Sequence, residues 1–219
     1  MKTLADVLAA DQTPHEELAN SLTHGLGLIL SIAGFLALLI LASVHATAWH
    51  VVSFSIYGAS LIMLYAVSTL YHSLPSSKIK TIFNMIDHCA IYVLIAGCYT
   101  PFSLVTLRGG WGWSLLGVAW SMAILGILLK ILYFEKSERF CLFLYLSMGW
   151  VIVIALKPLI ENLPMAGFIL LLCGGLSYSM GILFFKAEKM PFNHAIWHGC
   201  VLIGSACHYF CLFYYVLPV

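Results

Sequence analysis

The sequence predicts an all-α membrane protein, a bundle of seven transmembrane helices. Hydrophobic residues make up 62% of the 219-residue chain and charged residues only 9%, against about 45–50% and about 25% in soluble domains. Seven apolar stretches are long enough to cross a hydrocarbon layer of about 30 Å, which takes roughly 20 helical residues. These stretches are continuous rather than alternating, so helices are expected and barrel strands are not.

The seven spans are expected at residues 22–42, 51–72, 86–107, 112–132, 140–156, 165–185 and 194–217. The fifth is the shortest. Residues 1–21 form a separate N-terminal segment, in which residues 3–10 are expected to be a short interfacial helix. This segment is too acidic and too weakly apolar for a cleavable signal peptide. Residues 22–219 form one transmembrane domain.

Local signals refine three of the spans. Asn193 is a candidate N-cap of the seventh helix. Pro101 is expected to kink the third helix, because proline lacks the N–H that an α-helix needs. The sixth span carries small residues that favour close packing on a neighbour: Gly174, Gly175, Ser177 and Gly181.

The distribution of basic residues predicts the orientation in the membrane. Of ten Lys and Arg residues, only Arg108 and Lys157 fall on the side opposite to the N-terminus. The positive-inside rule then places the N-terminus in the cytoplasm and the C-terminus outside, in a multi-pass protein of the inner (plasma) membrane. The net charge of +1 and the lack of a Lys/Arg-rich stretch argue against nucleic acid as a partner. Membrane lipid is the expected partner.

Several histidines and a carboxylate gather at the predicted cytoplasmic ends of the helices. His72 ends the second span, Asp87 begins the third, and His194 and His198 begin the seventh. His194 and His198 are one helical turn apart and share a face. With His72 they offer three ligands to one metal ion and leave a position for water, which is the pattern of catalytic zinc.

Two further residues fit such a site. Ser68 lies one turn before His72, where its hydroxyl is placed to orient a ligand or the bound water. Asp87 is placed to hold that water or to act as a general base. A buried intramembrane carboxylate is costly and indicates function by default.

Other interpretations of these residues are open. Each histidine alone is more simply a satisfied polar residue. Glu17, Asn20 and His24 at the start of the first span form a candidate cap and hydrogen-bond cluster that ties this helix down. A haem would need a second helix with two well-spaced histidines, which the sequence does not offer.

Four motifs resemble the bacterial haemolysin III branch of the progestin and adipoQ receptor (PAQR) superfamily. They are EELANSLTHG at residues 16–25, STLYHSLP at 68–75, FNMIDHCAIYVLIAGCYTPF at 83–102 and NHAIWHG at 193–199. The resemblance spans essentially the whole chain. It implies zinc held near the cytoplasmic side by His72, His194 and His198, with Asp87 near its water. The choice of zinc over iron or manganese rests on this resemblance.

The resemblance leaves three functions open. The first is a zinc-dependent hydrolase of a lipid amide or ester, because wider relatives are alkaline ceramidases and receptors with suspected ceramidase activity. The second is a non-catalytic membrane-lipid sensor or homeostasis factor with structural zinc. The third is a pore-forming cytolysin, as the family name implies. No continuous polar stripe crosses the outer leaflet, where His208 is the main polar residue.

Overall fold

A computed structural model describes residues 12–133 and 138–217, which form helices with no strand among them. In chain order the elements are α2 (Pro14–His45), α3 (Ala48–Ser73), α4 (Lys78–Pro101), the π-helix η1 (Phe102–Thr106), α5 (Gly110–Leu132), α6 (Glu138–Trp150), the 3₁₀-helix η2 (Val151–Ala155), α7 (Leu156–Asn162), α8 (Met165–Phe185), α9 (Asn193–Cys211) and the π-helix η3 (Leu212–Val216). The predicted interfacial helix at residues 3–10 lies outside the described residues.

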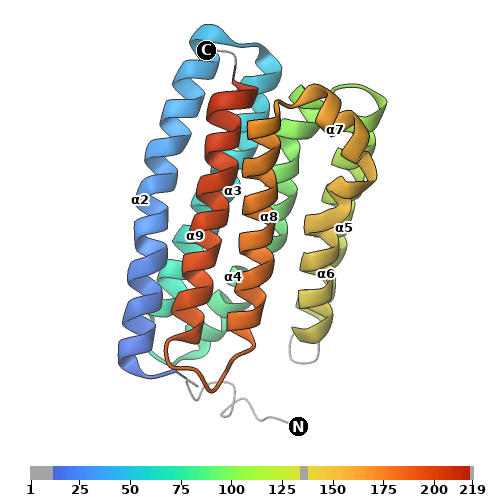
Figure 1. Ribbon diagram of the computed structural model, residues 1–219. Coiled ribbons are helices and arrows are strands. Elements are labelled where there is room, and N and C mark those ends of the chain that lie inside the picture. The colour runs from blue at the N-terminus through green and yellow to red at the C-terminus, as the bar shows by residue number, and fades with distance from the viewer. Residues whose placement is uncertain (1–11, 134–137, 218–219) are drawn as a thin grey trace.

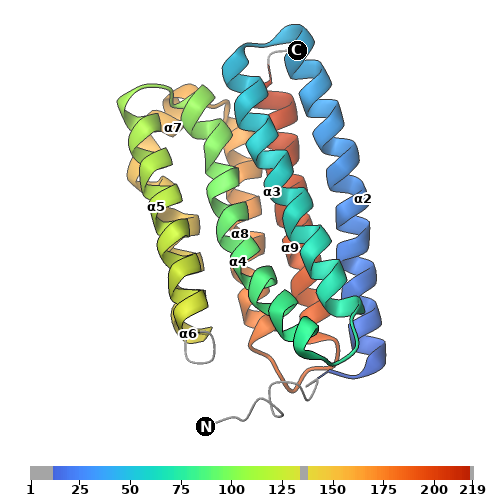
Figure 2. The same cartoon turned by 180° about the vertical axis from the view of Figure 1, so that it is seen from behind.

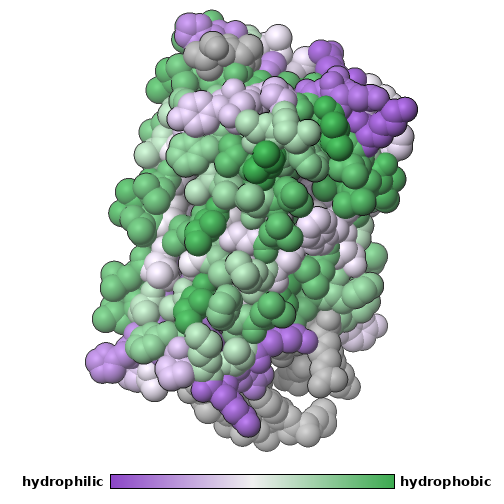
Figure 3. Space-filling view, in the orientation of Figure 1, coloured by the Kyte–Doolittle hydropathy of each residue, from purple (hydrophilic) through white to green (hydrophobic). Residues whose placement is uncertain are grey.

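Within the described residues, seven helical spans are long and apolar enough to cross a membrane. They alternate in direction, so the chain begins at one end of the bundle and finishes at the other (Figure 1). Seen from both sides, α5 and α6 form a pair at one edge, while α9 lies beside α2 and α8 (Figures 1 and 2). Hydrophobic side chains cover the flank of the bundle and hydrophilic ones gather at its two ends (Figure 3). The predicted class, a seven-span helical membrane protein, is confirmed.

The first helix begins earlier than predicted, at Pro14 rather than residue 22. Thr13 caps it: the Thr13 hydroxyl accepts the Glu16 N–H at 3.3 Å, and Glu16 Oε2 accepts the Thr13 N–H at 2.9 Å. This reciprocal pair is a capping box, and proline at the first helical position suits it. Glu17, Asn20 and His24 therefore lie inside the helix, so the cap proposed for them is wrong. Their hydrogen bonds point instead to the neighbouring helices.

Pro101, where a kink is expected, marks a change in the helix type of the third span. The regular α-helix α4 ends at Pro101 and continues as η1, where the Leu107 N–H donates to the Phe102 carbonyl at 2.7 Å. Because Pro101 lacks an N–H, the regular bonding pattern is lost here, and a π-turn keeps the chain helical.

The fifth span is a broken helix that extends to Asn162, rather than the helix expected to end near residue 156. Pro158 disrupts the α-helical pattern in the preceding turn, and residues 151–155 wind as a 3₁₀-helix. Tyr99 of α4 supplies hydrogen-bond partners to backbone groups at this break. Its hydroxyl donates to the Met148 carbonyl at 2.7 Å and accepts the Ile152 N–H at 2.9 Å. Backbone groups inside a membrane need such partners.

Small residues bring α8 against α9, as expected. A Cβ added to Gly174 would lie 2.4 Å from His208, and one added to Gly181 would lie 2.7 Å from Trp197. Gly175 faces open space instead. Asn193 does not cap α9, whose N-cap position is Phe192. The Asn193 amide donates to the Phe184 and Phe185 carbonyls, both at 3.2 Å. It thus supplies hydrogen-bond donors to backbone carbonyls that the end of α8 leaves unpaired.

Candidate metal centre

Three histidines from two helices meet near the end of the bundle at which α2 begins. His72 lies in the last turn of α3, and His194 and His198 lie in the first two turns of α9. One nitrogen from each ring lies within 4.8 Å of one from each of the other two. His72 and His198 are buried and His194 is half-buried. The three predicted ligands therefore form one cluster.

The chemistry of this cluster fits a metal ion. The Nε2 atoms of His72, His194 and His198 are buried and have no hydrogen-bond partner among the described residues. Buried polar atoms are almost always paired. Neutral imidazole nitrogens are good ligands for zinc, copper, iron and nickel. The ring pairs lie 4.6–5.0 Å apart between centroids at steep angles, so they do not stack on one another.

The first helix orients two of the three rings. Glu17 Oε2 lies 2.6 Å from His72 Nδ1, and the Asn20 carbonyl lies 3.3 Å from His198 Nδ1. A carboxylate and a carbonyl only accept hydrogen bonds, so both Nδ1 atoms carry the proton and both Nε2 atoms keep a free lone pair. In metal sites, the ring N–H of a ligating histidine that faces away from the metal typically donates to such a carboxylate or carbonyl.

Glu17 is itself held in place. Lys80 donates to Glu17 Oε1 at 2.8 Å and to the Leu74 carbonyl at 3.0 Å. Lys80 was not predicted as part of the site, although it lies seven residues before Asp87 and therefore on the same face of α4. Asn20 Nδ2 also contacts Gln12 Oε1 and lies 3.5 Å from His72 Nδ1. The predicted hydrogen-bond cluster of the first span is thus part of the histidine site.

Ser68 and Asp87 lie beside the histidines. The Ser68 hydroxyl is 2.7 Å from His24 Nδ1 and lies close to the Asp87 carboxyl group. Ser68 is fully buried and Asp87 is 4% exposed, so this carboxyl group has very little contact with solvent. The His24 ring stacks on the His198 ring, with centroids 3.4 Å apart and planes 11° from parallel. The three predicted ligands, Ser68, Asp87 and the polar residues of the first span therefore lie in one region.

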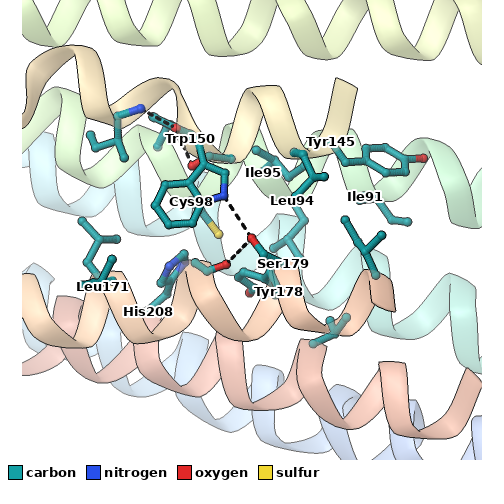
Figure 4. A pocket seen from close by; sticks show the side chains of 18 of the residues that line it. Ile91, Leu94, Ile95, Cys98, Tyr145, Trp150, Leu171, Tyr178, Ser179 and His208 are labelled. Carbon is teal, nitrogen blue, oxygen red and sulfur yellow. Dashed lines mark hydrogen bonds between the residues drawn. The ribbon is translucent and has the colours of Figure 1, made fainter. Parts of the chain in front are cut away.

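An apolar cavity of about 190 Å³ reaches this region. His24, Asp87 and Trp197 line it at the histidine end, and its walls come from α2, α3, α4, α6, α7, α8 and α9. Figure 4 shows apolar side chains such as Leu94, Ile95 and Leu171 facing its interior. A pocket with apolar walls and a few polar groups at one end is suited to an amphiphilic ligand.

The fold and the cluster together define a seven-span helical membrane protein with an intramembrane histidine site. A family profile described as haemolysin-III related matches residues 12–209, and the chain belongs to this family. It is 53% identical to Hemolysin-3 of Bacillus cereus over 93% of each chain. It is 49% identical to the Hemolysin-3 homolog of Bacillus subtilis (strain 168), over 94% of this chain and 97% of the relative.

A more distant relative is the human monocyte to macrophage differentiation factor. It is 33% identical, over 93% of this chain and 86% of its own. The two bacterial relatives and the more distant human relative agree with the predicted haemolysin III branch of the PAQR superfamily. The protein is a multi-pass membrane protein.

Proposed function

We propose that the protein is a zinc-dependent hydrolase that cleaves a lipid amide or ester inside the membrane. The observation that carries this proposal is the set of three buried, unpartnered Nε2 atoms. Asp87 and His24, which stacks on His198, line an apolar cavity in the same region. His72, His194 and His198 would hold the zinc ion. When bound, zinc polarises a carbonyl group and makes water a nucleophile near neutral pH.

Asp87 is the proton carrier of this proposal. Water attacks the lipid carbonyl carbon, the bond to nitrogen or oxygen breaks, and the leaving atom needs a proton. Asp87 accepts the proton from the attacking water and returns it to the leaving atom. Its carboxyl group faces the cavity that would hold the lipid.

Ser68 and His24 position Asp87. Ser68 hydrogen-bonds to the His24 ring and lies close to the Asp87 carboxyl group, and His24 in turn packs flat against His198. These contacts link the orientation of the Asp87 carboxyl group to His198, one of the proposed metal ligands. Ser68 is buried behind these groups, so it acts as a positioning residue.

The same cluster also supports a second candidate, a non-catalytic lipid sensor or homeostasis factor with structural zinc. The histidines join α3 to α9, and Glu17 and Asn20 join both to α2. A metal ion here would hold three helices together. A third candidate follows from the Hemolysin-3 name of two relatives, but a pore needs a polar path, and the cavity walls are mainly apolar.

Asp87→Asn separates the first two candidates. We expect turnover of a fluorescent lipid amide or ester, measured in detergent micelles, to fall by about 10²–10⁴-fold, as for loss of a general acid–base. The zinc content, measured by elemental mass spectrometry, should stay the same. Glu161→Gln, an exposed carboxylate change at the other end of the bundle, is the control and should leave turnover unchanged.

Two results would contradict the hydrolase. One is undiminished turnover in Asp87→Asn. The other is a zinc-loaded wild-type protein that cleaves neither an amide nor an ester, in which case the sensor becomes the better account. A pore would instead reveal itself as ion conductance in liposomes.

A further inference from the structure

A group of aromatic and basic side chains lies where α5 begins, at the end of the bundle opposite to the start of α2 (Figure 1). Trp49 is in the first turn of α3, Trp113 is in the first turn of α5, and Arg108 lies between η1 and α5. The two indole rings meet edge-on, with centroids 6.0 Å apart and planes 82° from parallel. His72 lies 23 residues after Trp49 on α3, about 35 Å along the helix axis. This group is therefore separate from the metal centre.

The guanidinium group of Arg108 is held against one of these rings. Its central carbon lies 4.3 Å from the centroid of the Trp49 ring, which is a cation–π contact. Gly109 turns the chain directly after Arg108, with a φ of 132° that glycine adopts readily and other residues rarely do. No hydrogen bond or ion pair joins Arg108 to another residue in the described part of the chain. Arg108 is exposed, so its planar fork of N–H donors is available at the surface.

The tryptophans place this group of side chains at the surface of the membrane. Tryptophan is enriched where the hydrocarbon layer meets the lipid headgroups. Trp111 and Trp113 are 49% and 55% exposed, and Val52, which lies one turn further along α3 from Trp49, is 49% exposed. These apolar surfaces face lipid rather than another helix. Arg108 therefore lies at the level of the headgroups, with apolar side chains beside it.

A negatively charged headgroup complements this surface. Among the ten Lys and Arg residues, only Arg108 and Lys157 fall at this end of the bundle. A guanidinium group matches a phosphate group through two parallel hydrogen bonds. Free phosphate would leave the exposed Trp113 ring uncovered, whereas the glycerol and acyl groups of a lipid cover it. In a zwitterionic lipid a cationic amine competes with Arg108 for the phosphate, and phosphatidylglycerol has no such amine.

We propose that Arg108, Trp49 and Trp113 form a binding site for the phosphate group of an anionic glycerophospholipid. The guanidinium group donates to the phosphate oxygens, and the Trp49 ring holds the guanidinium group in place. The Trp113 ring packs against the glycerol and the first part of the acyl chains. This lipid is a bound membrane component rather than the substrate, because the site is about 35 Å from His72. The inference goes beyond the proposed function and depends on neither zinc nor hydrolysis.

Native mass spectrometry of the detergent-purified protein tests this site. The protein is titrated with phosphatidylglycerol and, separately, with phosphatidylcholine that carries the same acyl chains. The lysines at the other end of the bundle also attract anionic lipid, so the decisive comparison is between variants. Arg108→Gln should weaken the binding of phosphatidylglycerol about fivefold and leave that of phosphatidylcholine unchanged. Because Arg108 is exposed, this variant should fold.

Lys157→Gln is the matched control. It removes the same charge at the same end of the bundle, but Lys157 contacts no aromatic ring among the described residues, so the affinity for phosphatidylglycerol should stay the same. Trp49→Leu keeps the charge of Arg108 but removes its ring contact, and should weaken the binding of this lipid.

Three results would overturn the inference. One is an unchanged affinity for phosphatidylglycerol in Arg108→Gln. Another is an equal loss of affinity in Arg108→Gln and Lys157→Gln, which would show that net charge alone attracts the lipid. The third is displacement of phosphatidylglycerol by inorganic phosphate, which would show a simple anion site.

Discussion

Glu17 of the first transmembrane helix and His72 of the second form a hydrogen bond of 2.6 Å between Oε2 and Nδ1. This bond fixes the tautomer of His72 and leaves its Nε2 facing His194 and His198. The first helix therefore contributes to the metal centre without supplying a ligand. Lys80, which pairs with the other oxygen of Glu17, extends the arrangement to a third helix.

Loss of this bond should weaken metal binding. In Glu17→Ala we expect zinc affinity to fall by about 10–100-fold, as is usual when the partner behind a metal-binding histidine is removed. Competition with a chromophoric zinc chelator measures the change. Glu16→Ala is a matched control one residue earlier, because Glu16 contacts Thr13 and the Phe192 N–H but no histidine. Equal losses in the two variants would show that helix stability, rather than orientation of His72, governs the affinity.

The break in the fifth span should depend on Tyr99. In Tyr99→Phe the Ile152 N–H loses its partner in an apolar environment, which should destabilise the protein by about 1–3 kcal/mol. Thermal unfolding in detergent measures this, and faster hydrogen exchange at residues 151–155 should accompany it. Tyr92→Phe is the control, because the buried Tyr92 hydroxyl has no hydrogen-bond partner among the described residues. A comparable loss of stability in Tyr92→Phe would contradict this role of Tyr99.

The orientation in the membrane is testable with terminal tags. The excess of Lys and Arg on the N-terminal side predicts a cytoplasmic N-terminus and, with seven spans, an external C-terminus. Protease added to intact cells stripped of their wall should remove a C-terminal tag and spare an N-terminal one. Removal of the N-terminal tag alone would place the histidine cluster at the outer leaflet instead.

Much of the candidate site follows from helical periodicity and topology. The four-residue spacing of His194 and His198 sets them on one face, and the alternating direction of the spans brings His72 and Asp87 to the same depth. Their neighbours in three dimensions do not follow from such arguments. That Glu17 meets His72, and that His24 stacks on His198, depends on how α2 rotates about its axis and packs on α3 and α9.

Local backbone features were less predictable than the spans. The apolar sequence at residues 140–156 looks like a continuous helix, and only the contact with Tyr99 explains how a break is tolerated within it. Asn193 has the residue type of an N-cap, but its amide serves the preceding helix because the connection between α8 and α9 is short. The cavity is lined by side chains of seven helices, α2, α3, α4, α6, α7, α8 and α9, so no single segment specifies it.

The metal content of the protein decides whether His72, His194 and His198 form a zinc site. Elemental mass spectrometry of the detergent-purified wild type should find about one zinc ion per chain, and His198→Ala should lose it. His88→Ala should retain the ion, because His88 Nδ1 instead bonds to the Asn84 carbonyl at 2.8 Å and His88 lies outside the cluster. A well-folded wild type without metal, or a His198→Ala variant that keeps its zinc, would contradict the account.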